Sequence, residues 1–378
     1  MPRDLPAQPS TRAQSVTCEL AVVVPTFNEH DNVPELLQAL ERALEGIEWE
    51  VVFVDDDSSD ATADEVRALA ASHSRVRCVQ RIGRRGLASA CVEGILATTA
   101  PYVAVMDADM QHDETILPRM LARLKSEALD VVVGSRYVDG GGLGSWDAGR
   151  ARISRLATRL ARRVVPAGLT DPMSGYFVMT REAFMGAVRQ LSSLGFKILV
   201  DLFASSPRPL RFAEVGYTFR TRHHGDSKLD SHVAWDYAML LLDKTIGRWV
   251  PVRFVAFSLV GGLGVFVHMA VLAVLFNSAA TTFAVAQACA TGVAMVSNFA
   301  INNALTYRDQ RLSGLQWFRG LLSFMAACSI GALANVGIAD YLFAHGGKWF
   351  VAGLAGILVG AVWNYSVTAL YTWKRSSV

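Results

Sequence analysis

Hydrophobic and polar positions alternate along the first third of the chain in a pattern typical of strands that are each followed by a helix. Short valine-rich runs predict buried strands at 19–25, 50–54, 75–80 and 102–106. Between them, apolar residues at helical spacing predict helices over 31–45, 62–72 and 87–98. Strands joined in this order usually pair in parallel, so we expect a parallel sheet with helices on both faces.

A different pattern begins near residue 251, where long apolar runs follow one another. They cover 251–276, 279–305, 317–344 and 349–373. Each run is long enough to cross a hydrocarbon layer of about 30 Å. The last third of the chain is therefore predicted to be an all-α transmembrane domain of four helices.

Two amphipathic segments lie between these patterns. In the first, 149–166, four apolar residues share one helical face and arginines surround it: Ile153, Leu156, Leu160 and Val164. A basic helix of this kind is typical of an anionic membrane surface. A helix packed on the sheet with a solvated basic face would show the same pattern. The second segment, 231–250, is predicted to be an amphipathic interface helix that joins the two domains.

The 378 residues divide accordingly into a leader, a globular domain, the interface helix and the membrane domain. We expect their bounds at 1–18, 19–230, 231–250 and 251–378. The leader is predicted to be disordered, because it has no apolar core and no cleavage site that would make it a secretory signal. Five cysteines without metal-site spacing give no indication of zinc or of a disulfide framework. We expect no nucleic-acid partner.

Polar clusters follow three of the predicted strands, at the ends where open α/β sheets bind their ligands. They are Pro25-Thr-Phe-Asn-Glu29, Asp55-Asp-Asp57 and Asp107-Ala-Asp109. Because Asp107 and Asp109 are two residues apart, they would project from one side of a strand, with Gln111 in the loop that follows. Two carboxylates and an amide oxygen suit Mg²⁺ or Mn²⁺, which leave positions open for phosphates. The pattern favours a diphosphate-activated substrate, although an Asp-x-Asp alone could be a solvated strand end.

Seven motifs, in order along the globular domain, make the chain resemble glycosyltransferase family 2 and, within it, the dolichyl-phosphate mannose synthases. They are Val24-Pro-Thr-Phe-Asn-Glu29, Val54-Asp-Asp-Asp-Ser-Ser-Asp-Ala-Thr62, Arg85-Gly-Leu-Ala-Ser-Ala90, Met106-Asp-Ala-Asp-Met-Gln-His112, Gly134-Ser-Arg-Tyr137, Thr170-Asp-Pro-Met-Ser-Gly-Tyr176 and Arg222-His-His-Gly-Asp-Ser-Lys-Leu229. The resemblance implies an α/β GT-A (Rossmann-like) catalytic domain. The four spans resemble a small membrane family associated with O-antigen glycosylation and sometimes proposed to move lipid-linked sugars.

The resemblance also implies a role for individual residues. The donor would be bound by Pro25, Thr26, Asn28, Glu29, Asp55, Asp56, Asp107, Ala108, Asp109, Asp171, Arg222 and Lys228. Mg²⁺ or Mn²⁺ would be held by Asp107, Asp109 and Gln111, and the phosphate of the acceptor by Arg136, Arg150 and Ser154. Of these, Asp107, Asp109 and Arg136 would be catalytic.

These roles imply the inverting transfer of a sugar, mannose from GDP-mannose, to a polyprenyl (dolichyl-type) phosphate. A phosphate with a second pKa of about 6 is mostly ionised at neutral pH, so no general base is required. Arginines would instead bring the two anionic substrates together. Two alternatives stay open: a UDP-sugar such as UDP-glucose as the donor, and a translocator of lipid-linked sugars with a nucleotide-binding head.

Basic residues flank the four spans unevenly. They gather before the first span, between the second and third, and after the fourth, whereas only Lys348 marks the other loops. By the positive-inside rule we expect a multi-pass protein with its head and both termini in the cytosol. The asparagines within the spans are expected to hydrogen-bond between helices, although they could instead serve a path for a lipid phosphate: Asn298, Asn302, Asn335 and Asn364. A homo-oligomer stays open.

Overall fold

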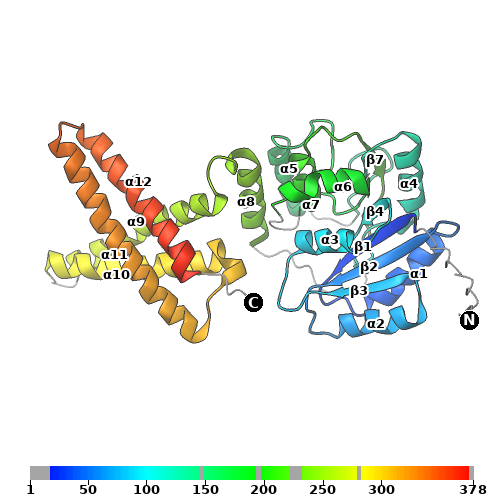
Figure 1. Cartoon of the computed structure of the whole chain (residues 1–378), viewed down its shortest axis with the longest axis horizontal. Coiled ribbons are helices and arrows are strands. Elements are labelled where there is room, and N and C mark those ends of the chain that lie inside the picture. The colour runs from blue at the N-terminus through cyan, green and yellow to red at the C-terminus, as the bar shows by residue number, and fades with distance from the viewer. Residues whose placement is uncertain (1–17, 145–147, 193–196, 222–231, 279–281, 374–378) are drawn as a thin grey trace, which may run out of the picture. The chain divides into compact units, whose positions relative to one another are not determined.

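The computed structural model describes residues 18–144, 148–192, 197–221, 232–278 and 282–373. Clustering of contacts divides the chain into two compact units, one ending at Thr245 and the other beginning at Ile246. Figure 1 shows the strands in the first unit and long helices in the second. Each unit is described by itself below.

The first unit is built on a seven-stranded sheet with the order β3-β2-β1-β4-β6-β5-β7. Its strands are β1 (Leu20–Thr26), β2 (Trp49–Asp55), β3 (Val76–Gln80), β4 (Tyr102–Val105), β5 (Val131–Ser135), β6 (Phe177–Thr180) and β7 (Phe212–Gly216). The parallel pairing predicted for the first four strands is confirmed. The sheet as a whole is mixed and not parallel as expected, because β6 runs antiparallel to β4 and β5. The chain enters β6 from the edge where β5 ends, because Ser174 just before it donates to the Gly134 carbonyl of β5.

Helices cover both faces of this sheet, as predicted. They are α1 (Asn32–Ala43), α2 (Thr62–Ser72), α3 (Leu87–Leu96), α4 (Leu117–Ser126), α5 (Ala148–Ala161), α6 (Arg181–Ala187), α7 (Ile198–Ser205) and α8 (His232–Ile246). Val22 and Val24 of β1 face the apolar layer of α1, α2 and α4. Val23 faces the layer that includes α3, α6, α7 and α8. This alternation is the period of two that a strand buried on both faces requires.

An ion-pair cluster lies at the start of β5. The Asp130 side chain is buried and accepts hydrogen bonds from Arg208 Nη1 and Nη2 at 2.7 and 2.8 Å and from the Arg211 backbone N–H at 2.8 Å. The hydrogen bonds from Arg208 hold the pKa of Asp130 well below its ordinary value. Because this pKa is lowered on folding, Asp130 stabilises the folded state most at a pH at which its carboxylate is charged in both the folded and the unfolded chain.

Asp130→Asn is therefore expected to lower the thermal midpoint of unfolding at pH 7. The stability due to the carboxylate is present above the unfolded pKa of about 3.9 and is lost as the pH falls toward the lower native pKa. The difference in midpoint between the wild type and the variant should then shrink below about pH 4. Thermal unfolding of the two purified proteins from pH 7 to pH 3 checks this, and a constant difference across that range would contradict it.

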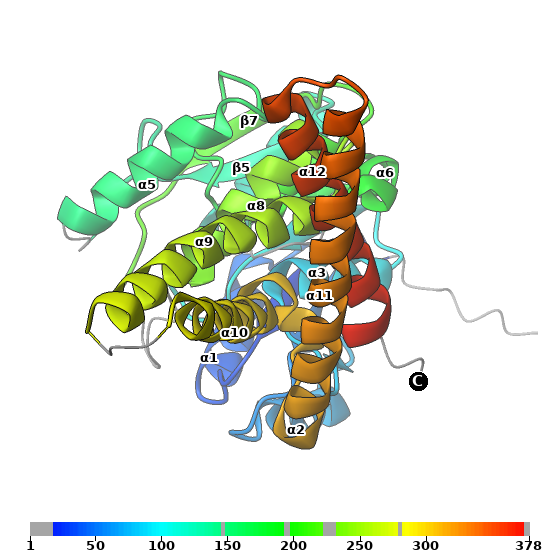
Figure 2. The same cartoon turned by 90° about the vertical axis from the view of Figure 1, so that its left-hand side faces the viewer.

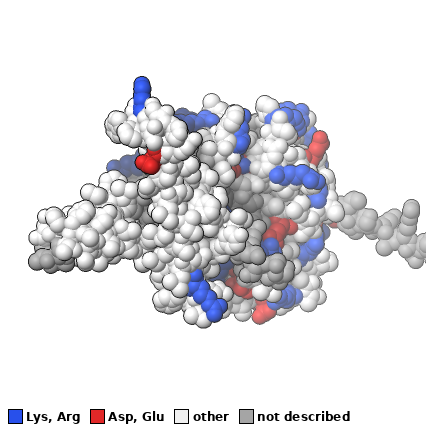
Figure 3. Space-filling view, turned by 60° about the vertical axis from the view of Figure 1, so that its left-hand side comes forward, with Lys and Arg blue, Asp and Glu red and all other residues white. Residues whose placement is uncertain are grey.

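Among its described residues, the second unit contains four helices that are long and apolar enough to span a membrane: α9 (Val252–Ser278), α10 (Phe283–Ile301), α11 (Gly314–Ala344) and α12 (Trp349–Val367). The last turns of the second and fourth spans are π-helical, at Asn302–Thr306 and Thr368–Thr372. Few charged side chains interrupt the apolar surface of the spans on the face shown in Figure 3. The chain is a multi-pass membrane protein.

The four spans form two hairpins that repeat one pattern. Helices α9 and α10 lie side by side, as do α11 and α12 (Figure 1 and Figure 2). Corresponding residues are 66 or 67 positions apart, and the pairs are Phe257 and Phe324, Gly264 and Gly331, Asn298 and Asn364, and Tyr307 and Trp373. Small buried residues also recur every fourth position in both, at Ala286, Ala290 and Ala294 and at Ala352, Gly356 and Gly360. The two π-helical turns occupy equivalent places.

Aromatic residues join the two hairpins to each other. Tyr307 stacks on Trp373 with ring centroids 4.1 Å apart, and Phe257 lies 6.3 Å from Phe324. Each of these contacts joins a residue to its own counterpart in the other hairpin. Asn303 adds a polar contact, because its Oδ1 accepts a hydrogen bond from Trp373 Nε1 at 3.1 Å.

Glycine and asparagine meet at the same place inside each hairpin. A Cβ added to Gly264 would overlap the Asn298 side chain, and one added to Gly331 would overlap that of Asn364. The Oδ1 atoms of both asparagines are buried and accept no hydrogen bond from any residue in the described part of the chain. The expected interhelical hydrogen bond is therefore wrong for these two oxygens, and what the asparagines do is fill the gap that glycine leaves.

Helix α12 offers a matched pair of glycines to test this packing. A Cβ on Gly356 would lie 2.5 Å from the Asn335 carbonyl oxygen and 3.1 Å from the Ala339 Cβ, whereas one on Gly353 would meet nothing within 4 Å. We expect Gly356→Ala to cost about 1–3 kcal/mol in the free energy of unfolding through overpacking. Gly353→Ala should be neutral or slightly stabilising, since alanine favours helix. Thermal unfolding in detergent would distinguish them, and equal effects would contradict the packing.

Candidate active site

The three predicted metal ligands lie in the loop that follows β4. The strand ends at Val105, so Asp107 and Asp109 are not on a strand, and the alternation expected from their spacing does not place them. A left-handed residue, Met110 at φ 61°, turns the loop back instead. The Asp107 side chain is 37% exposed, whereas Asp109 as a residue is only 5% exposed. One carboxylate thus faces the outside and the other the interior.

Gln111 is held in a definite orientation in the same loop. Its Nε2 donates to the Arg220 carbonyl at 3.1 Å, and the Arg220 N–H donates to the Gln111 carbonyl at 3.0 Å. With its nitrogen engaged, the amide oxygen is the atom available to a cation. Two carboxylates and this oxygen form a donor set that fits Mg²⁺ or Mn²⁺. Among the described residues there is no group of three or more His, Cys, Asp or Glu placed to hold a metal.

Arg220 connects this loop to the segment after β7. Its guanidinium donates to Asp113 at 2.6 Å and to Glu114 at 2.7 Å. Arg220 lies two residues before the motif that contains Arg222 and Lys228, both of which lie outside the described residues. The structure therefore shows Arg220 itself beside the loop of Asp107, Asp109 and Gln111, called the metal loop below.

His112 ends the loop inside an aromatic enclosure. It is 3% exposed, and its ring stacks on Tyr176 with a centroid distance of 5.0 Å. The edges of Tyr217 and Phe219 complete the enclosure at 5.9 and 5.8 Å. Burial lowers the pKa of His112 to about 4, against the opposing effect of Asp109. The imidazole is therefore neutral at physiological pH.

Arg136 and Asp171, which the sequence assigned to different substrates, form a buried ion pair. Arg136 Nε and Nη2 each donate to Asp171 at 2.8 Å, and the Arg136 N–H donates at 3.1 Å. Burial alone would lower the pKa of Arg136, but its hydrogen bonds to the Asp171 carboxylate outweigh this effect and the pKa is raised. Bidentate pairing fixes the plane of the guanidinium.

The three carboxylates of the 55–57 cluster are engaged by the protein itself. Asp55 accepts from the Ser58 N–H at 3.0 Å, which closes the turn after β2. Asp56 accepts from Arg81 Nη1 at 2.5 Å and from the Gly86 N–H at 2.6 Å, and Asp57 accepts from the Gly83 N–H at 3.2 Å. Asp56 and Asp57 thus hold the loop between β3 and α3 beside the expected nucleoside site.

The polar cluster at 25–29 is held by hydrogen bonds to the protein itself, next to the turn after β2. Asn28 has a left-handed backbone, φ 53°, and its Oδ1 accepts from the Ser59 N–H at 3.0 Å. Glu29 is buried and accepts from Asn32 at 2.6 Å. The cluster is therefore tied to the turn after β2, as expected if both lie at one ligand-binding edge of the sheet.

Helix α5 combines a buried face with an exposed apolar one. Thr158 and Ala161 are buried, whereas Leu156 and Leu160 are 58% and 38% exposed. Ser154 Oγ lies 3.0 Å from the hydroxyl of Tyr137, and Tyr137 directly follows Arg136 in the sequence. The helix therefore extends from the Arg136 end of the site. Nothing is described of the Arg150 side chain.

Helix α8 packs on the same unit. Leu240 belongs to its apolar core, and the Tyr237 hydroxyl donates to the Ala157 carbonyl of α5 at 2.7 Å. Lys244 forms a buried ion pair with Asp201 at 2.7 Å. The segment predicted as an interface helix is thus fixed to the sheet unit by contacts along its length.

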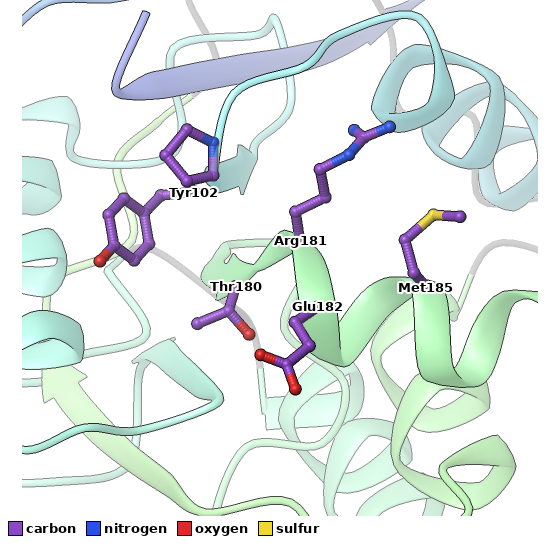
Figure 4. A pocket seen from close by; sticks show the side chains of 6 residues that line it. Tyr102, Thr180, Arg181, Glu182 and Met185 are labelled. Carbon is purple, nitrogen blue, oxygen red and sulfur yellow. The ribbon is translucent and has the colours of Figure 1, made fainter. Parts of the chain in front are cut away.

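A pocket of about 440 Å³ lies at the opposite end of the sheet, where β4 begins (Figure 4). Tyr102, Thr180, Glu182 and Met185 line it together with Arg181, whose guanidinium points away to the Ile95 carbonyl at 2.9 Å. The metal loop leaves β4 at its other end. The pocket is therefore separate from the candidate active site.

Several residues at the site have no counterpart in the predicted set. They are Arg81, His112, Tyr137, Lys197 and Arg220. Of these, Lys197 donates a hydrogen bond to the Met173 carbonyl at 3.1 Å. His112 and Tyr137 were inside quoted motifs and could have been found there. The other three come from loops with no pattern of their own.

Comparisons with known proteins cover both units. The model "Glycosyl transferase family 2" matches residues 21–186, and "GtrA/DPMS, transmembrane domain" matches residues 256–373. A dolichol-phosphate mannosyltransferase of Pyrococcus furiosus is 31% identical over 357 residues, covering 94% of this chain and 99% of the relative. That of Saccharomyces cerevisiae is 34% identical over 235 residues, covering 60% and 86%.

One solved structure with a similar sheet is the glucosyl-3-phosphoglycerate synthase of Mycobacterium tuberculosis in complex with Mn²⁺, uridine diphosphate and phosphoglyceric acid. It is 19% identical, with a TM-score of 0.43, and the match covers 60% of this chain and 78% of that one.

Proposed function

Because the chain belongs to glycosyltransferase family 2 and resembles the dolichol-phosphate mannosyltransferases within it, we propose that it transfers mannose from GDP-mannose to a polyprenyl phosphate. The products would be a polyprenyl-phosphate sugar and GDP. The observation that carries the proposal is the loop after β4, where Asp107, Asp109 and Gln111 offer three oxygen donors.

The metal loop would act on the donor. When bound there, Mg²⁺ or Mn²⁺ would neutralise the charge that develops on the leaving diphosphate. Asp109 is fixed by its hydrogen bond from the Gln111 N–H at 3.2 Å, and Gln111 is fixed by Arg220. The protein therefore supplies ligands whose positions are set before the substrate binds, which is the condition for electrostatic stabilisation.

Arg136 would act on the acceptor. Its guanidinium is held by Asp171, and the hydroxyl of the next residue, Tyr137, lies 3.0 Å from Ser154 Oγ of α5. A cation fixed in this way attracts the acceptor phosphate toward the donor despite their like charges. The phosphate is already an ionised nucleophile, so Arg136 would orient it for direct attack on the sugar with inversion.

The exposed leucines of α5 support contact with a membrane surface. Leu156 and Leu160 are exposed between arginines that are exposed as well, Arg155 and Arg159. A solvated helix has no need of exposed leucines, whereas a helix lying on anionic lipid buries them. We propose that α5 brings the head to the surface where the acceptor phosphate lies.

The proposed orientation places the head and both termini in the cytosol. Arg248 precedes the first span, Arg253 lies at its start, and Arg308 and Arg311 follow the second. Fusing a reporter that is active only in the cytosol to the C-terminus tests it, and an inactive fusion in a stably expressed protein would reverse the assignment.

Labelled GDP-mannose and labelled UDP-glucose, each incubated with membranes containing the protein, polyprenyl phosphate and Mn²⁺, decide the donor. Label that becomes soluble in chloroform only from GDP-mannose supports the proposal. Label from UDP-glucose alone would replace mannose by glucose and leave the acceptor unchanged. No lipid label from either donor would overturn the proposed reaction.

A further inference from the structure

His112 contacts both the backbone and the side chain of Asp107. Its Nδ1 accepts a hydrogen bond from the Asp107 N–H at 3.1 Å. A nitrogen that accepts this bond carries no hydrogen, so the ring proton of the neutral imidazole is on Nε2. That Nε2 lies 3.8 Å from Asp107 Oδ2. The imidazole thus presents an acceptor to the backbone and a donor to the carboxylate.

The ring cannot turn away from this arrangement. It is stacked on Tyr176 and bounded by two further aromatic edges, and only 3% of the residue is exposed. The Gly175 backbone also lies close to both side chains, because a Cβ at this position would lie 3.5 Å from Asp107 Oδ2 and 3.6 Å from His112 Cε1. The Asp107 carboxylate therefore lies close to the fixed His112 ring and to the Gly175 backbone.

We propose that His112 is a positioning residue for the divalent cation, which it serves by holding Asp107 in the geometry of a ligand. This inference rests on the proposed function, since it takes Asp107 as a ligand. His112 acts through Asp107 and touches neither substrate. Groups that orient metal ligands commonly change metal affinity by 10–100-fold when they are removed.

The test measures binding of Mn²⁺ itself to the full-length protein in detergent, by the electron paramagnetic resonance signal of free Mn²⁺. His112→Phe keeps a ring to stack on Tyr176 but has neither the acceptor nor the donor. We expect Mn²⁺ affinity to fall by about 10–100-fold. The maximal transfer rate should return to within a few-fold of the wild type at saturating Mn²⁺. His112→Gln, whose amide offers both an acceptor and a donor, should recover part of the affinity.

Tyr217→Phe is the matched control in the same enclosure. The Tyr217 hydroxyl is buried and makes no hydrogen bond to any described residue, so its removal should leave Mn²⁺ affinity unchanged. Equal affinities of the wild type and both His112 variants would overturn the role of His112 alone. If the wild type itself binds no Mn²⁺, the cation site and with it the proposed function are overturned. Should His112→Phe not unfold cooperatively, His112→Gln decides, and its affinity must still be lower than that of the wild type.

Discussion

Asp109→Ala is expected to reduce sugar transfer by roughly 1000-fold or more, since a bound metal ion stabilises several kcal/mol of developing charge. Asp109 is buried and accepts a hydrogen bond from the Gln111 N–H, so its carboxylate has a fixed position in the loop after β4. The rate would be measured as lipid-soluble label at saturating Mn²⁺.

Two further variants serve as controls for Asp109→Ala. Asp109→Asn retains an oxygen for the Gln111 N–H but loses the charge, and it should be nearly as inactive as the alanine variant. Asp64→Asn changes an exposed carboxylate on α2 whose side chain is 77% exposed, and it should be fully active. Transfer by Asp109→Ala within tenfold of the wild type would remove Asp109 from the metal site.

Asp171→Asn is expected to cost about 3–5 kcal/mol in the free energy of unfolding, because it leaves the buried Arg136 guanidinium without a counter-charge. Asp171 is 0% exposed and Arg136 8%. Transfer should fall as well, since the guanidinium loses the partner that fixes its plane. Thermal unfolding and transfer, measured on the same preparation, report the two effects separately.

An exposed ion pair serves as the control for the stability effect of Asp171→Asn. Glu127→Gln breaks the exposed pair with Arg123, whose atoms are 2.6 Å apart, and should change stability by no more than about 0.5 kcal/mol. Replacing both Arg136 and Asp171 by apolar residues should restore part of the lost stability but none of the activity. If Asp171→Asn is as stable as the Glu127 variant, the pair is not the buried contact described.

The element pattern of the chain could be predicted well because hydrophobic periodicity carries it. The helix expected over 62–72 is observed over those residues, and each predicted span overlaps one long helix. The direction of β6 could not be predicted, because it depends on where the chain lies between β5 and β6 and no local pattern records that. Its Ser174 contact with Gly134 joins residues 40 apart in sequence.

The site was predicted as a set of motifs but not as a set of contacts. Asp107, Asp109 and Gln111 lie in one loop because they are neighbours in sequence. The pairing of Arg136 with Asp171 and of Asp56 with Arg81 joins residues 35 and 25 positions apart, and these contacts assign each side chain a protein partner. Spacing along a chain reports which residues share a loop, whereas ion pairs between loops arise from the fold.

The glycine and asparagine contacts of the membrane domain have a consequence for biosynthesis. Gly264 meets Asn298 within the first hairpin, and Gly331 meets Asn364 within the second. Each hairpin can therefore form its close helix contact from its own sequence, before the other has left the ribosome. We expect the chain to enter the bilayer two helices at a time, with the stacking of Tyr307 on Trp373 as the final step that joins the two halves.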